Sequence, residues 1–222
     1  MTPLARRDRR AFARAAAWAG SILASPSVAE GWDDPASVAR YRVGGLAAHL
    51  AQGLARLDDV LARPAPEGVE PLDLVGFFGT HRLDTPDDLD APAPAFLRRL
   101  AEDAAAAGPA AVAASFAACV ERVGHRLAHE SADRLVPVLS VPGAATRLDT
   151  YLTTRVVELV VHGDDLMASV DPAVPLPAVP ALSVDVALAA LVTLARARSG
   201  DAAVLAAFTR RERAEPGRLL VF

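Results

Sequence analysis

Residues 155–166 read RVVELVVHGDDL and place a glutamate and a histidine four positions apart, at Glu158 and His162. At about 100° per residue, an α-helix brings such positions onto one face. The apolar residues around them recur at helical spacing, at Leu148, Leu152, Val156, Leu159, Gly163 and Leu166. The stretch therefore predicts an amphipathic helix over about residues 144–170, with Tyr151, Arg155, Glu158, His162 and Asp165 along one flank of its buried stripe.

A second helix is predicted over about residues 43–62, ending before the pair Arg63-Pro64, where the proline cannot continue it. Its apolar stripe comprises Leu46, Leu50, Gly53, Leu54, Leu57, Val60 and Leu61. His49 lies at the edge of this stripe, and Gly53, one turn later, is expected to leave open space beside the imidazole.

A glutamate at the edge of a core is costly unless its charge is compensated, and a divalent cation can do this for a carboxylate and imidazoles together. We therefore consider His49, Glu158 and His162 as a metal site with an open position. Such ligands suit a catalytic zinc, and iron, nickel or manganese are also compatible with them. The alternative from spacing alone is an ordinary surface pair in which Arg155 neutralises Glu158.

His125 and His129 are also four residues apart and form a rival pair. They fall on a helix predicted from Gly108-Pro109 to about residue 129, whose buried face comprises Val112, Phe116, Cys119, Val120, Val123 and Leu127. Both histidines project from roughly the opposite side, so we expect them to be solvated. Cys119 is expected to be a small core residue and not a nucleophile. His81 falls in a predicted loop, where it either lines a pocket mouth or is simply exposed.

The remaining chain is also predominantly helical by pattern, so the fold class is mainly α. Further helices are predicted over about residues 4–25, 72–78, 95–106, 183–198 and 201–213, with a loop over 81–94 and a strand candidate at 219–222. The segment DPAVPLPAVP at 171–180 is rich in proline and predicts a stiff linker. We therefore expect a helical bundle over 1–170, the linker, and a short, reduced C-terminal domain over 181–222.

Composition limits the functional classes. The 222 residues carry a net charge of -4, and all 23 basic residues are arginine. Beyond the first turns the chain has no run of basic residues, and no helix-turn-helix is found near either terminus, which argues against a nucleic-acid partner or a transcription regulator. One cysteine cannot form an internal disulfide, so a reducing cytosol is expected. The arginines at 6–10 resemble an export signal, but Arg14 interrupts the apolar run, and no stretch reaches the roughly 18 residues of a membrane span. A soluble, cytoplasmic protein is expected.

Two motifs carry a resemblance to a known family: VGGLAAHL at 43–50, after a loop containing Trp32, and RVVELVVHGDDL at 155–166. With them the sequence resembles the DinB-like helical bundle proteins, specifically the mycothiol-dependent maleylpyruvate isomerase N-terminal family of actinobacteria. The resemblance covers roughly residues 10–170. It implies a DinB-like four-helix bundle with a short C-terminal α(+β) extension, in which His49, Glu158 and His162 bind the metal, zinc being expected.

The resemblance also implies a function. Mycothiol or a similar thiol would be the cosubstrate for isomerisation or S-transfer on a small-molecule substrate, and the thiolate would be the nucleophile. Arg155 would either bind a substrate carboxylate or hold Glu158 in place, and Asp165 would either orient a ligand or face water. The alternative function is that of a non-catalytic metal-binding or stress-associated bundle protein. For both functions we expect a monomer or a homodimer.

The family enzyme also carries a longer α/β C-terminal domain, which contributes an arginine to its active site. Here Arg210, Arg211 and Arg213 are candidates for that role, but none can be aligned with it, and they equally suit a solvated helix end.

Overall fold

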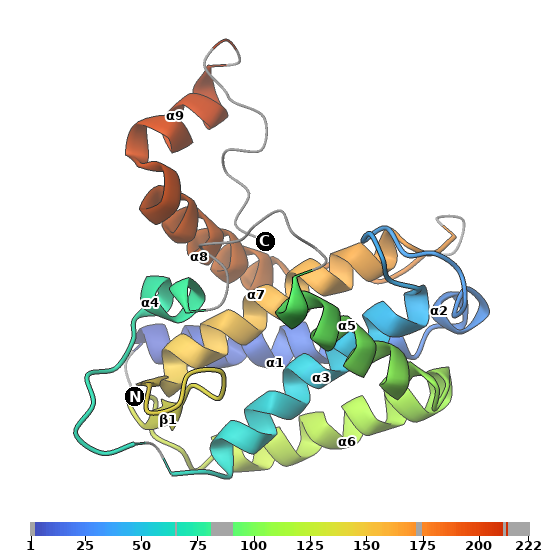
Figure 1. The fold of residues 1–222 in the computed structure, drawn as a ribbon, viewed down its shortest axis with the longest axis horizontal. Coiled ribbons are helices and arrows are strands. Elements are labelled where there is room, and N and C mark those ends of the chain that lie inside the picture. Colours follow the sequence, from blue (N-terminus) through green and yellow to red (C-terminus); the bar gives the residue numbers. More distant parts are fainter. Residues whose placement is uncertain (1–2, 65, 81–90, 172–174, 211, 213–222) are drawn as a thin grey trace.

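The computed structural model describes residues 3–64, 66–80, 91–171, 175–210 and 212, and its fold is mainly helical, as predicted (Figure 1). Four long helices form the bundle: α1 (Pro3–Leu23), α3 (Val43–Leu61), α6 (Pro109–Leu127) and α7 (Leu148–Met167). Shorter helices lie between them, namely α2 (Pro26–Glu30), α4 (Leu74–Gly79) and α5 (Pro92–Ala105). Two further helices, α8 (Ala181–Ser199) and α9 (Asp201–Thr209), follow the bundle.

Local sequence signals set most helix boundaries. Ser25 and Asp73 cap α2 and α4 by accepting hydrogen bonds from the backbone N–H groups of Val28 and Gly76. Proline stands in the first turn of α2, α5 and α6, where no hydrogen-bond donor is required. Gly200, at φ 81°, separates α8 from α9 in a backbone conformation that favours glycine.

A small antiparallel hairpin precedes α7 and was not predicted. β1 (Leu135–Pro137) pairs with β2 (Ala145–Arg147), and the register places Val136 opposite Thr146. Helix α7 therefore begins at Leu148 and not near residue 144, as the sequence suggested. Pairing with a strand eight residues away replaces the first helical turn, and Thr146 also donates a hydrogen bond to the carbonyl of Leu72.

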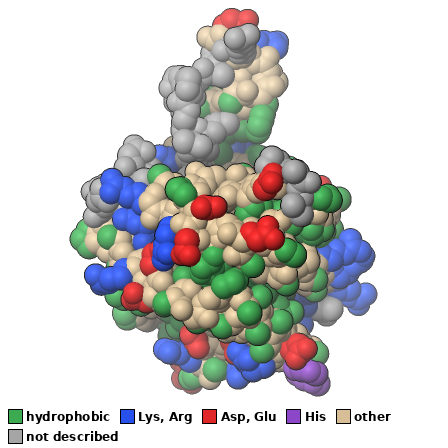
Figure 2. Space-filling model, turned by 90° about the vertical axis from the view of Figure 1, so that its right-hand side faces the viewer, with side chains coloured by type: hydrophobic (Ala, Val, Ile, Leu, Met, Phe, Trp, Pro, Cys, Tyr) green, Lys and Arg blue, Asp and Glu red, His purple; other side chains and the backbone are tan. Residues whose placement is uncertain are grey.

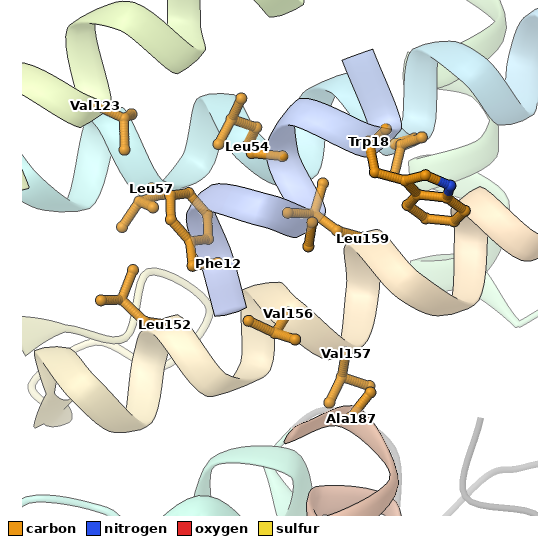
Figure 3. Close-up of a cluster of buried hydrophobic side chains, with 14 of the residues drawn as sticks. Phe12, Trp18, Leu54, Leu57, Val123, Leu152, Val156, Val157, Leu159 and Ala187 are labelled. Carbon is orange, nitrogen blue, oxygen red and sulfur yellow. The ribbon is translucent and has the colours of Figure 1, made fainter. Parts of the chain in front are cut away.

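The core lies where α1, α3, α6 and α7 meet (Figure 3). Leu57 of α3 and Phe12 of α1 point toward the apolar face of α7, which contributes Leu152 and Val156. The predicted α7 stripe is buried along its whole length. These apolar faces explain why the helices pair, since burying one large aliphatic side chain stabilises the fold by about 1.5–3 kcal/mol.

Helix α8 extends this packing. Val157 of α7 faces Ala187 of α8, and the buried Ser183 hydroxyl donates a hydrogen bond to the Ala11 carbonyl at 2.8 Å. The described part of the preceding proline-rich segment is fixed to the bundle by Trp18, whose Nε1 donates to the carbonyl of Pro177 at 2.8 Å. Helix α9 packs against α8 and projects from the body (Figure 1).

The surface view shows the projecting C-terminal helix and a body face on which acidic and basic side chains are interspersed (Figure 2). Within the described residues, no single helix combines the length and the apolar character needed to cross a membrane. One pair of helical segments, Pro94–Ala105 and Pro109–Leu127, is long and apolar enough when the two are taken together, by length and composition only. The pair is bent by 106° at the break between the segments.

Candidate metal centre

His49, Glu158 and His162 lie together on facing sides of α3 and α7. One ligand atom from each, two imidazole nitrogens and a carboxylate oxygen, falls within 4.8 Å of the others. The apolar stripes of both helices pack into the core, which turns their edges toward one another. The three residues that sequence analysis nominated as metal ligands are thus brought together.

His162 is held between two carboxylates of its own helix. Its Nε2 lies 3.2 Å from Oε2 of Glu158, one turn earlier, and its Nδ1 lies 3.2 Å from Oδ2 of Asp165, nearly one turn later. The His49 ring approaches from α3 with its centroid 5.0 Å from that of His162, at an interplanar angle of 79°. Asp165 therefore touches a candidate ligand and does not simply face water.

The electrostatics of the metal-free cluster favour a negatively charged Glu158 beside a protonated His162. Burial opposes ionisation of Glu158, but hydrogen bonding with His162 and the charge of Arg155 hold its pKa well below the usual range. Burial likewise opposes protonation of His162, but the hydrogen bonds to Asp165 and Glu158 outweigh it and raise the pKa to about 9. In the absence of metal, a proton on His162 supplies part of the positive charge that this cluster attracts.

Arg155 is a buried guanidinium between the two helices, with 7% of its surface exposed. Its Nη1 donates to the carbonyl of Gly53 at 3.3 Å, and its Nη2 lies 4.0 Å from Oε1 of Glu158. The guanidinium carbon lies over the Tyr151 ring, 5.0 Å from its centroid. Arg155 thus links α7 to α3 and supports Glu158.

The loop before α3 contacts one of the candidate ligands, His49. The Tyr41 ring lies 5.7 Å from that of His49, and the preceding Arg40 has a φ of 69°, a conformation that is rare for a residue with a side chain. Ser37 fastens the loop to the end of α7, since its hydroxyl donates to the carbonyl of Asp165 at 2.8 Å.

A cavity of about 110 Å³ opens beside the centre, and His49 and Glu158 form part of its wall. Gly53 also lines it, as expected from its missing side chain. The other lining residues come from five parts of the chain: Gln52 and Arg56 of α3, Phe77 and Phe78 of α4, Leu97 of α5, Val138, Leu139 and Ser140 after β1, and Tyr151 and Arg155 of α7. The cavity therefore gives a small molecule access to two of the candidate ligands.

Other candidates from the sequence lie away from this cavity. His125 and His129 are exposed, and the buried Cys119 packs in the core, as predicted. Val120, predicted to be buried, is only partly so. Arg210 is exposed at the end of α9, whereas His81, Arg211, Arg213 and the strand candidate 219–222 lie outside the described residues.

The cavity residues that the sequence did not indicate include Arg56, Phe77, Phe78 and the segment after β1. Arg56 follows His49 by seven positions on α3, so the helical wheel could have placed both on one face. The residues after β1 reach the cavity only because the hairpin folds back, and no local sequence pattern predicts that contact.

The donor set fits a divalent metal ion. Two imidazoles and one carboxylate are a common ligand set of catalytic zinc and leave a position for a further ligand. Within the described residues, this is the one group of three or more potential ligand side chains close enough to share an ion.

Comparisons with known proteins agree with this architecture. The sequence model of the family described as the mycothiol maleylpyruvate isomerase N-terminal domain matches residues 9–167. The matched range contains all four long helices of the bundle except the start of α1. No curated protein matches the chain, and no solved structure matches it.

Proposed function

The chain belongs to the mycothiol maleylpyruvate isomerase N-terminal domain family, and from this premise we propose that it is a metal-dependent enzyme. It would use mycothiol or a similar low-molecular-weight thiol for isomerisation of, or S-transfer to, a small electrophilic substrate. The observation that carries the proposal is the His49–Glu158–His162 cluster, with ligand atoms within 4.8 Å of one another, at the wall of a cavity.

The chemistry requires a thiolate near neutral pH. A divalent cation bound at these three residues would lower the pKa of a coordinated thiol sulfur and so supply the nucleophile. In an isomerisation, the thiolate adds to an activated double bond and leaves again after rotation about the resulting single bond. In an S-transfer, it displaces a leaving group.

The chain's own residues have distinct parts in this scheme. Asp165 accepts a hydrogen bond from His162 and orients the imidazole, and Arg155 steadies the charged form of Glu158. Phe77, Phe78 and Tyr151 form an apolar wall against which a small substrate can pack away from water.

The proposal is tested with purified, zinc-loaded protein, mycothiol and two electrophiles. Maleylpyruvate reports isomerisation, and monobromobimane reports thiol consumption by S-transfer. We expect a thiol-dependent rate above the uncatalysed one, and its loss on removing the metal with a chelator. Full metal occupancy without catalysis of either reaction would contradict the proposed activity and favour a non-catalytic metal-binding bundle.

A further inference from the structure

The described residues that line the cavity beside the metal centre carry a net positive charge, although the chain as a whole is acidic. Among the described residues, two arginines, Arg56 and Arg155, line it together with one carboxylate, Glu158. A divalent cation at the centre would add further positive charge. A site of this charge attracts an anionic ligand.

The two arginines differ in how they are held. Arg155 is nearly buried and its guanidinium is already occupied, with contacts to Gly53, Glu158 and the Tyr151 ring. Reorienting it toward a ligand would remove the positive charge that supports Glu158. A role in positioning the metal ligand therefore suits Arg155 better than direct binding of substrate.

Arg56 is partly exposed and lines the same cavity. It forms no ion pair with a carboxylate of the described residues, unlike Arg42, Arg122 and Arg126 around the same helix, which bind Asp33, Glu102 or Asp58. A guanidinium has five donors in a planar fork that matches a carboxylate. Arg56 can therefore turn to an anion without breaking an ion pair with a described residue.

We propose that Arg56 binds the anionic group of the substrate or thiol, with a carboxylate as the preferred chemistry, whereas Arg155 is a positioning residue. This inference rests on the proposed function, because it assumes that the ligand reacts at the metal centre. His49 and Arg56 are seven residues apart on α3, which corresponds to about 10 Å along the helix axis. The anionic group and the reacting atom are accordingly separated by several bonds, with an apolar portion between them against Phe77, Phe78 and Tyr151.

The test measures binding and not turnover. Cobalt(II) replaces zinc in the full-length protein, so that thiolate coordination appears as a charge-transfer absorption band. Two probes of equal length are titrated, 6-mercaptohexanoate and 6-mercaptohexan-1-ol. We expect wild-type protein to bind the carboxylate about tenfold more tightly, as one charge-assisted contact allows.

Variants assign this preference to a residue. Arg56→Gln should bring the affinity ratio close to one, and Arg56→Lys should retain part of it. Arg14→Gln, an exposed site on α1 with the same change in net charge, should leave the ratio unchanged. Thermal unfolding of each variant checks that the fold is intact.

The outcomes separate this inference from the proposed function. Equal affinities in wild-type protein, or a ratio that survives in Arg56→Gln, would overturn the role of Arg56. Failure to bind cobalt would count against the proposed function alone. In that case hexanoate and hexan-1-ol are compared on the metal-free protein by calorimetry, where a preference lost in Arg56→Gln supports the inference and no preference overturns it.

Discussion

The carboxylate of Asp165 lies 3.2 Å from Nδ1 of His162, on the side of the ring opposite Glu158. This arrangement fixes the ring and leaves Nε2 facing the other candidate ligand of the helix, Glu158. Carboxylates that hold a ligating histidine in this way raise its basicity as well as its order. The contact places Asp165, within the sequence HGDDL, directly beside the candidate ligand His162.

Asp165→Asn should weaken zinc binding about 10–100-fold without abolishing it, because the amide orients the imidazole less well and does not support its charge. Competition with a chromophoric chelator measures this affinity. Asp164→Asn is a matched control, since Asp164 is the exposed neighbour. Equal losses in both variants would contradict a specific role for Asp165.

Zinc affinity should depend on pH through His162. The hydrogen bonds to Asp165 and Glu158 overcome the effect of burial and raise its pKa to about 9, so metal must displace a proton at neutral pH. Affinity should therefore rise about tenfold per pH unit as the pH approaches 9 and then level off with respect to this group. Chelator competition between pH 6 and pH 10 provides the measurement, and a flat profile would contradict this titration.

Gly163, next to His162, should be required for packing. A Cβ at this position would overlap the rigid ring of Trp18. Gly163→Ala should therefore reduce the free energy of unfolding by about 1–3 kcal/mol, as measured in urea. Gly124→Ala on α6 is the control, because its Cβ would meet no atom within 4 Å and should be neutral or stabilising. Similar effects at both sites would refute the packing argument.

Asp8 should limit stability at neutral pH. Burial and the charge of Asp149 raise its pKa above the ordinary 3.8. The folded state therefore binds this proton more tightly than the unfolded state, and the charged form becomes a cost as the pH rises through the raised pKa. Asp8→Asn should increase Tm at pH 7 and have little effect below pH 3.8, where both states are protonated. A lower Tm at pH 7 would contradict this assignment.

Helical periodicity was sufficient for most of the fold. The stretch VGGLAAHLAQGLARLDDVL became α3 with its end one residue from the predicted position, because Pro64 and a continuous apolar stripe both mark its length. The strand pair before α7 was not predicted, because β2 has only three residues and is defined by its pairing with β1 and not by a local sequence pattern. The short α2 was missed for a related reason, because five residues are too few to show periodicity.

The candidate site likewise includes residues that the sequence predicts and contacts that it does not predict. His49, Glu158 and His162 could be nominated because each lies at the edge of a long apolar stripe, where the wheel fixes its direction. The pairing of Arg155 with Glu158 was among the alternatives from the sequence, but its contact with the Gly53 carbonyl could not be foreseen. That contact depends on how α3 packs against α7. The cavity wall from α4 and the segment after β1 likewise depends on tertiary contacts between distant parts of the chain.

Metal content of the purified protein tests the central claim most directly. Elemental analysis should find about one zinc ion per chain in wild-type protein. His162→Ala and His49→Ala should each lose it, and His125→Ala, which alters an exposed histidine on α6, should retain it. Full occupancy in His162→Ala would show that His49, Glu158 and His162 do not form the metal centre.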